Sequence, residues 1–489
     1  MTRLLTVDLG TSVTKVALWD ETGMLAAGRV PLRTVHGPSG RVEQDPDSWW
    51  ASLVEGCRQT IGDRPAGAAA APEAVVLTGA RQTFVPVDGG GDPIGAALVW
   101  SDRRATEEAV ELRRQRQLAP KGVCVTGPPL DGASLTAKMA WLARHEPSRL
   151  DRARWLVGPR DLVAWRLCGE LATDSTMASA TGLYDAHGQV VALARDHAEL
   201  LPPVVNAGTV VGKAGEAEGR ALGVPPGTPV VLGAADRPSE VLGSGAEAGR
   251  AMVAWGTTAN VSLPVDRLPD PLPSELSITR AAADGWLLEG GVSAAGSLLE
   301  WLATFTGTEV EQLLVATENV GPGADGLVVL PWLFGARAPW WHDGAGAALV
   351  GLGAQHDAGA VARAALEAVA CELTRCLEAM ARHGRSAEAL AVGGSSATGL
   401  LWLEILAAVS GLAWLRRRSG EAALAGAAII GARALGLTWR LDDLDPVTSQ
   451  GTPEPTLSEH YRRLRPRWDE AALAVIRLGA HDATVASPH

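Results

Sequence analysis

The sequence has little of what marks several classes of protein. Only five of its 489 residues are cysteines, and none of them has the CxxC or Cys/His spacing of a zinc site. We therefore expect buried, reduced thiols rather than disulfides. No apolar run is long enough to span a bilayer, and the N-terminus lacks a basic region followed by an apolar stretch. These absences predict a cytoplasmic protein that has no membrane partner.

Positive charge is scarce too. Lys and Arg number 43 against 55 Asp and Glu, which gives a formal net charge of -12 at pH 7. Proteins that bind nucleic acid usually carry a basic surface, so we expect no nucleic-acid partner. No P-loop of the form GxxxxGK(S/T) is present, so any nucleotide must be held by another kind of turn. The chain is too long for one ordinary domain, and two domains are predicted.

The first chemical signal is an acid at the end of an apolar strand, in "LLTVDLGTSVTKVALWD". Asp8 ends the strand, Gly10, Thr11 and Ser12 form a turn, and Lys15 lies on the next strand. A glycine turn lets backbone N–H groups approach phosphate oxygens, and the hydroxyls and the ammonium add donors. The acid would repel a phosphate but suits Mg²⁺. The alternative is an acid and a hydroxyl that only cap a hairpin.

Related turns recur later in the chain. "PVVLGAAD" is another buried strand that ends in an acid, Asp236, although this residue could also be the N-cap of a helix. "GRAMVAWGTTANVSLPV" repeats the strand–turn–strand pattern with Gly256 and Thr257, which suggests a duplicated architecture with one phosphate-facing turn per domain. "LAVGG" ends at Gly394, and the turn that continues into Ser395 suits close approach to a nucleotide. Two acids near a phosphate cradle suit phosphoryl transfer: one organises Mg²⁺ and the other accepts the proton of the attacking hydroxyl.

Hydrophobic periodicity and turn residues predict alternating strands and helices. Residues 3–32 read as an antiparallel meander, and residues 45–61 read as an amphipathic helix. A long helix is expected over 357–384, with Gly384 as its stop. The Pro- and Thr-rich segment 445–455 is expected to be a loop, and a last helix follows it.

In their order and spacing these segments resemble the FGGY family of carbohydrate kinases, between residues 4 and 437. The stretches that carry the resemblance are "DLGTSVTKVAL", "VEQDPDSWW", "ALVWSDRRA", "LGAAD", "AWGTTAN", "LPWLFGARAP", "GLGAQHDAGAVARAALEAV" and "AVGGSSATG". The resemblance implies an α/β fold of two RNase H-like domains, of the actin and hexokinase superfamily, with a cleft between them. The expected parts are an N-terminal sugar domain (1–244), a C-terminal nucleotide domain (245–440) and a loop and helix packing back on the body (441–489).

The resemblance also implies roles for individual residues. Asp236 would be the catalytic base and Asp8 the second acid, with Mg²⁺ close to both carboxylates. The sugar would bind beside Asp236 and four neighbours, which are Arg81, Gln82, Trp100 and Arg237. ATP would contact a first phosphate loop and a second set of residues, which are Gly10, Thr11, Ser12 and Lys15, and Gly256, Thr257, Gly296, Glu300, Gly394 and Ser395.

The identity of the sugar is the least constrained prediction. The "EQDPDSWW" and "HEP" segments look most like the xylulokinase branch, which implies phosphorylation of a ketopentose such as D-xylulose to D-xylulose 5-phosphate. The chain departs from that branch at Ala80-Arg81-Gln82-Thr83, where Gln-Met-His-Gly is usual. It departs again at Arg237, which follows the base. Arg237 could pair with Asp236 or another acid, or could join Arg81 in binding a sugar acid.

Several alternatives therefore stay open. The acceptor could be ribulose, a tetritol, a glycerol-like polyol or a sugar acid. The chain could also be a non-catalytic sugar- or nucleotide-binding protein of the same fold, although the two acids and Lys15 are retained. A homodimer is a family-level expectation only.

Overall fold

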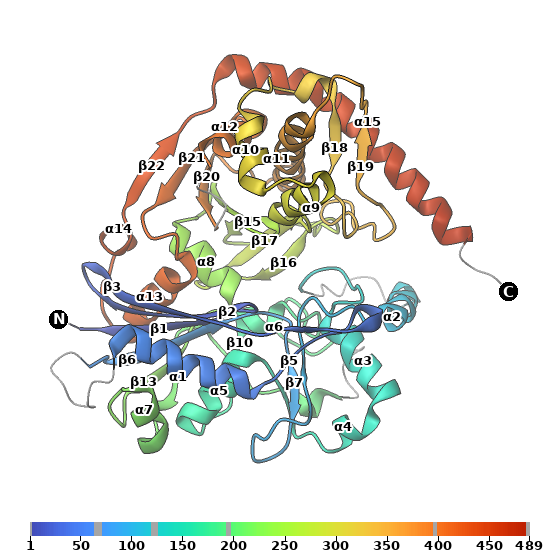
Figure 1. Cartoon of the computed structure of the whole chain (residues 1–489). Coiled ribbons are helices and arrows are strands. Elements are labelled where there is room, and N and C mark those ends of the chain that lie inside the picture. The colour runs from blue at the N-terminus through green and yellow to red at the C-terminus, as the bar shows by residue number, and fades with distance from the viewer. Residues whose placement is uncertain (1, 63–70, 119–125, 192–196, 395–398, 486–489) are drawn as a thin grey trace. The chain divides into compact units, whose positions relative to one another are not determined.

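The computed structural model describes residues 2–62, 71–118, 126–191, 197–394 and 399–485 (Figure 1). The chain forms two compact units. The first consists of Met1–Ser244, Ile278–Trp286 and Glu421–Pro446, and the second of Gly245–Ser277, Leu287–Gly420 and Val447–His489. The first unit thus includes Ile278–Trp286 and Glu421–Pro446, although the sequence analysis assigned residues 245–440 to the C-terminal domain. The segment 441–489, which was expected to form one part, is divided between the two units.

A six-stranded sheet lies at the centre of the first unit, in the order β12-β13-β6-β1-β2-β3. Strands β1, β6 and β13 are parallel, whereas β2, β3 and β12 are antiparallel to their neighbours. The predicted opening meander is present as β1 to β3. The strands are β1 (Leu4–Leu9), β2 (Val13–Asp20), β3 (Gly23–Pro31), β6 (Ala74–Gly79), β12 (Thr209–Lys213) and β13 (Pro229–Leu232).

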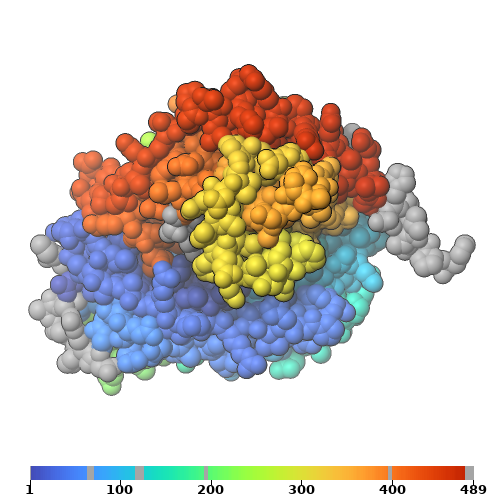
Figure 2. Space-filling model, turned by 45° about the horizontal axis from the view of Figure 1, so that its top comes forward, coloured from blue at the N-terminus to red at the C-terminus, as the bar shows by residue number. Residues whose placement is uncertain are grey.

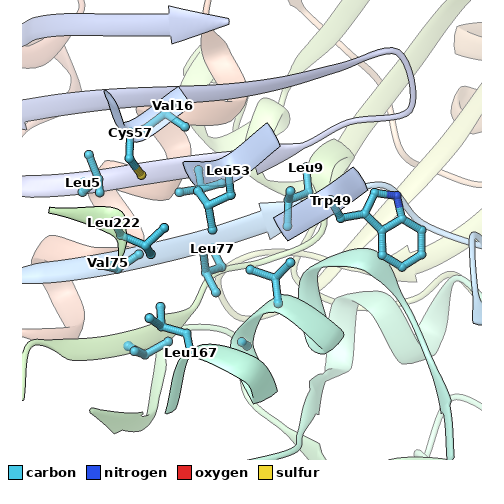
Figure 3. Close-up of a cluster of buried hydrophobic side chains, with 14 of the residues drawn as sticks. Leu5, Leu9, Val16, Trp49, Leu53, Cys57, Val75, Leu77, Leu167 and Leu222 are labelled. Carbon is cyan, nitrogen blue, oxygen red and sulfur yellow. The ribbon is translucent and has the colours of Figure 1, made fainter. Parts of the chain in front are cut away.

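Alternation along β1 sends successive side chains to opposite faces of this sheet. Leu5, Val7 and Leu9 enter a core with residues of α1, α5 and α7 (Figure 3), whereas Leu4 packs with Ala427 of α13 on the other face. Figure 1 shows α1 and α13 on opposite sides of the sheet. The helices on the two faces are α1 (Asp47–Ile61), α5 (Pro159–Cys168), α7 (Glu216–Leu222), α8 (Asp236–Ser244) and α13 (Ala422–Ala434).

Helices α8 and α13 cross at a pair of glycines. A Cβ on Gly243 would overlap the backbone of Ala422, and a Cβ on Gly426 would overlap the backbone of Ser239. Only glycine allows the two helix backbones to approach this closely. The Ala-rich α13 lies against α8, β1 and β6.

Shorter elements complete the first unit. Trp49 of α1 belongs to the main core, Trp165 of α5 packs against it, and a second cluster forms around Phe84 and Leu142. Most of β16 (Ser277–Arg280) belongs to this unit. The other elements are β4 (Val35–His36), η1 (Pro38–Gly40), β5 (Val42–Gln44), β7 (Val85–Val87), β8 (Ala97–Leu98), α2 (Thr106–Leu118), α3 (Leu135–His145), α4 (Pro147–Asp151), β9 (Trp155–Val157), β10 (Thr173–Asp174), α6 (Ser175–Ser179), β11 (Val204–Val205) and α14 (Leu441–Leu444).

Six strands of a seven-stranded sheet lie in the second unit and repeat the pattern of the first, in the order β17-β15-β14-β20-β21-β22. Strands β14, β20 and β21 are parallel, whereas β15 is antiparallel to β14 and β22 is antiparallel to β21. The prediction of a loop over 445–455 was wrong, because this segment contains β22. The strands are β14 (Arg250–Trp255), β15 (Ala259–Val265), β17 (Trp286–Val292), β20 (Ala389–Gly393), β21 (Ala413–Arg417) and β22 (Val447–Gly451).

The longest buried helix of the second unit is α11, which ends before Gly384 as predicted, with φ of 71° at that glycine. No helix in the described part of the chain is both long and apolar enough to cross a membrane. The segment with α9 and α10 is exposed and appears yellow in Figure 2. The remaining elements are α9 (Gly296–Thr306), α10 (Val310–Thr317), η3 (Ala324–Gly326), β18 (Val328–Leu330), β19 (Ala348–Val350), α11 (Ala358–Arg382), α12 (Leu400–Ser410) and α15 (Pro455–Val485).

Candidate functional site

The predicted acids of the first unit lie at one edge of its sheet. Because β1, β6 and β13 are parallel, their carboxyl ends meet at this edge. Asp8 lies near the end of β1, Arg81 follows β6, and Asp236 follows β13 as the first residue of α8. Lys15 is the cross-strand partner of Asp8, so both side chains lie on the face that α13 covers. The sheet therefore gathers residues that are over two hundred positions apart.

Asp8 is in an unusual environment for a carboxylate. It is 7% exposed, and its Oδ1 atom has no hydrogen-bond partner among the described residues. Burial raises the pKa of Asp8 to about 7. The Lys15 ammonium opposes that shift, and the carboxylates of Asp236 and Glu240 add to it. Three acids thus share one neighbourhood, and a bound cation would stabilise their charged forms.

Lys15 does not stand alone beside the turn. Its ammonium lies 3.0 Å from Oε2 of Glu421, whose side chain is 6% exposed and also pairs with Arg29. Glu421 is the N-cap residue of α13. The acid fixes the lysine while the lysine side chain remains 30% exposed. Glu421 was not predicted, because 406 residues separate it from its partner.

The side chain of the predicted base, Asp236, is accessible, and one of its carboxylate oxygens is held by a hydrogen bond. The Asp236 side chain is 40% exposed, and its Oδ1 accepts a hydrogen bond of 2.7 Å from the backbone N–H of Arg237. Nε of Arg81 lies 3.6 Å from the same oxygen. The Arg237 guanidinium pairs at 2.5 Å with Glu240, one turn further along α8. Of the interactions predicted for Arg237, the structure therefore shows an ion pair with an acid other than Asp236, namely Glu240.

A buried arginine supports the turn that leads to Asp236. Arg160 is fully buried and donates to Asp161 and Asp174 at 2.6 Å, and to the carbonyl of Gly233 at 2.9 Å. Asp174 accepts a hydrogen bond from the Thr176 hydroxyl, and the oxygen of that hydroxyl accepts one from the backbone N–H of Ala235. The network anchors both sides of the turn. Sequence reasoning missed it, since no local pattern marks it.

The predicted first phosphate turn contacts Trp100, the tryptophan that was predicted to bind the sugar. Nε1 of Trp100 donates to the Thr11 hydroxyl at 2.9 Å, and the Gln44 amide donates to the Thr11 carbonyl at 2.5 Å. A Cβ on Gly10 would meet the Val13 carbonyl oxygen at 2.8 Å, which explains the glycine. Ser12 is exposed beside them. The turn is therefore fixed in place with its hydroxyl groups at the strand edge.

Four of the second unit's residues that were predicted to contact the nucleotide also lie close together. The backbone N–H of Gly296, at the start of α9, donates to the Gly256 carbonyl at 2.9 Å, and that of Ser297 donates to Thr257. Gly394 has φ of 95° and packs on the backbone of Trp255, the last residue of β14. The pairing of β14 with β20 thus brings the two glycine turns together.

Two predicted residues remain outside this arrangement. Glu300 lies exposed on α9, one turn after Gly296. Ser395 falls outside the described residues. Gln82 has φ of 60°, in the left-handed region, and its carbonyl accepts from Lys138, a buried residue that the sequence did not single out.

The residues present fit a magnesium ion that is held mainly by water and phosphate. The described residues contain no cluster of three His, Cys, Asp or Glu side chains able to hold a metal on their own. The buried Oδ1 atom of Asp8 lacks a partner and lies beside Asp236 and Glu240, as the pKa of Asp8 reflects. Mg²⁺ prefers oxygen ligands and keeps several waters, so one carboxylate with a nucleotide phosphate suffices.

Comparisons with known proteins agree over nearly the whole chain. The N-terminal domain of the FGGY family of carbohydrate kinases matches residues 3–243, and the C-terminal domain matches residues 251–435. A xylulose kinase of Escherichia coli (strain K12) is 27% identical over 85% of this chain and 86% of its own. A glycerol kinase of Methylibium petroleiphilum is 31% identical over 91% and 93%, and a gluconokinase of Bacillus licheniformis is 24% identical over 95% and 94%. The crystal structure of xylulose kinase from Rhodospirillum rubrum is similar with a TM-score of 0.86 and 26% identity, over 98% of this chain and 100% of that chain.

Proposed function

This chain belongs to the FGGY family of carbohydrate kinases, and on that premise we propose that it phosphorylates a neutral ketopentose, with D-xylulose as the first candidate. Enzymes of this family are phosphotransferases with an alcohol acceptor, and a kinase of this family uses ATP. The observation that carries the catalytic part is the common strand edge of Asp8 and Asp236.

In the proposed reaction Asp236 orients the acceptor hydroxyl and takes its proton. The sugar oxygen forms a bond to the γ-phosphorus, the bond from that phosphorus to the bridging oxygen breaks, and ADP leaves. Accessibility of the Asp236 side chain supports this role. Lys15 and the Gly10–Thr11–Ser12 turn would hold phosphate oxygens at the same edge. Mg²⁺, when bound beside Asp8, would neutralise charge on the phosphates.

The ion pairs around Asp236 support a neutral acceptor over a sugar acid. A carboxylate substrate needs a guanidinium that can turn both N–H groups toward it. The Arg237 guanidinium is paired with Glu240, and Arg81 lies against Asp236. An added anion would therefore have to share guanidinium groups whose charge is already balanced by these acids. Relatives named glycerol kinase and gluconokinase make glycerol and gluconate the competing acceptors.

An ADP-release assay over a panel of acceptors tests the proposal. The panel is D-xylulose, D-ribulose, a tetritol, glycerol and gluconate. We expect the highest kcat/KM with D-xylulose. A clear preference for gluconate or glycerol would overturn the substrate, and no ADP release with any acceptor would overturn the kinase.

A substitution tests the base. Asp236→Ala is expected to leave ATP binding intact and to lower kcat by about 10²–10⁴, the usual contribution of a positioned general base. Asp151→Ala, at an exposed acid of the same unit, is the control and should match the wild type. Asp236→Ala with more than a tenth of wild-type kcat would contradict the assignment.

A further inference from the structure

Lys138 is a buried cation to which the proposed mechanism gives no part. It lies on α3 with its side chain fully buried, and in the described part of the chain no carboxylate comes within ion-pair distance of its ammonium. Lysine is rarely buried in full without a partner, because removing an ammonium from water is costly. The burial therefore indicates that the hydrogen bonds of this ammonium have a specific use.

The ammonium bonds two backbone carbonyls. Nζ donates to the Val99 carbonyl at 2.7 Å and to the Gln82 carbonyl at 3.4 Å. These carbonyls belong to two different segments, one that follows β6 and one that follows β8. The first segment contains Arg81 and the second contains Trp100. A single side chain thus joins the two segments that supply the proposed sugar contacts.

Both segments depend on such support. Gln82 has φ of 60°, a conformation that residues other than glycine keep only where their surroundings hold it. Trp100 is joined to the same turn through its backbone N–H, which donates to the Thr83 hydroxyl at 3.0 Å. The indole of Trp100 then reaches the Thr11 hydroxyl of the phosphate turn. Release of either carbonyl would loosen this connection.

We propose that Lys138 is a positioning residue of the kinase, whose ammonium holds the Gln82 and Val99 carbonyls and so presents Arg81, Gln82 and Trp100 to the acceptor sugar. This inference depends on the proposed acceptor site. Lys138 touches neither the sugar nor the phosphate in this role. It acts on acceptor binding through the shape of the two segments.

The protonation of Lys138 falls in the working pH range. Burial lowers the pKa of Lys138 to about 7, Asp102 and Asp131 oppose that shift, and Arg104 and Arg103 add to it. The ammonium form therefore prevails below pH 7 and is lost as the pH rises above it. A neutral amine gives weaker hydrogen bonds to carbonyls than an ammonium does. Acceptor affinity should consequently fall in the alkaline direction.

Steady-state kinetics from pH 6 to 8.5 test the proposal, with D-xylulose or the best acceptor of the panel. For the wild type, the acceptor KM should rise about tenfold across this range. A change of this size corresponds to the difference in free energy between a charge-assisted and a neutral hydrogen bond. Lys138→Met should show a raised acceptor KM that no longer varies with pH, and an ATP KM within about twofold of the wild type. Lys138→Arg, which keeps its charge, should lack the alkaline rise. Lys213→Met, at an exposed lysine of β12, is the charge-matched control.

Three outcomes would overturn the inference. The first is a wild-type acceptor KM that stays constant from pH 6 to 8.5, a measurement that needs no variant to fold. The second is a Lys138→Met enzyme with the wild-type acceptor KM. The third is an equal rise in the KM values of ATP and acceptor, which would indicate general damage. If no acceptor is phosphorylated at all, that result overturns the proposed function. The role of Lys138 is then tested separately, by measuring the acceptor affinity of the wild type by calorimetry over the same pH range.

Discussion

Replacement of Arg160 by methionine should destabilise the first unit strongly. The side chain is fully buried and donates to Asp161 and Asp174 at 2.6 Å. Methionine fills similar space but would leave two carboxylates, 3% and 0% exposed, without their counter-charge. Breaking a buried ion pair by removing one partner costs about 3–5 kcal/mol. At about 2–4 °C per kcal/mol for a unit of this size, the thermal midpoint should fall by about 6–20 °C.

Thermal and urea unfolding, followed by circular dichroism, would measure this loss. Arg220→Met removes an exposed ion pair with Glu216, one turn away on α7, and should change the free energy of unfolding by about 0.5 kcal/mol or less. A loss for Arg160→Met of under about 1 kcal/mol would refute the reasoning. It would mean that the two acids take up protons or water in the variant at little cost.

Two further predictions concern the turns proposed to hold phosphate. Gly394→Ala should lower stability by more than about 1 kcal/mol and weaken nucleotide binding, because φ is 95° and the added Cβ would overlap the backbone of Trp255. Gly393→Ala, where a Cβ meets nothing within 4 Å, should be tolerated, and equal unfolding curves for the two variants would contradict the explanation. Lys15→Met should raise the KM for ATP about tenfold or more, the value of a charge-assisted hydrogen bond, with the acceptor KM unchanged. Freed from Lys15, Glu421 still pairs with Arg29, so a large loss of stability instead would refute the phosphate role.

The sequence predicted those parts of the fold and site that short-range patterns determine. Strand alternation and turn glycines located β1 to β3 and the turns at Gly10 and Gly256, and the parallel strands then placed Asp8 and Asp236 at one edge. The repeat of strand, turn and strand also reflects a real repetition of sheet order in both units.

Patterns of a few residues could not predict what depends on distant contacts. Glu421 meets Lys15 only because α13 returns to the first sheet. The hydrogen bonds of Lys138 go to backbone carbonyls, which every residue has, so the side chains in the sequence do not indicate them. Strand β22 was missed because a polar edge strand lacks the apolar alternation of a central one. Glu240 was also missed, but a short-range pattern could have found it, because its helical spacing from Asp236 and Arg237 is visible in the sequence.

The return of α13 to the first sheet also matters for synthesis. A ribosome that has made residues 1–244 has made all six strands of this sheet, but the face around Leu4, Val76 and Val231 lacks its cover. Cover arrives only with the segment Glu421–Pro446, after most of the second unit has been translated. During that interval the nascent chain exposes an apolar surface on which it can aggregate. A fragment that ends at Ser244 would expose the same surface permanently.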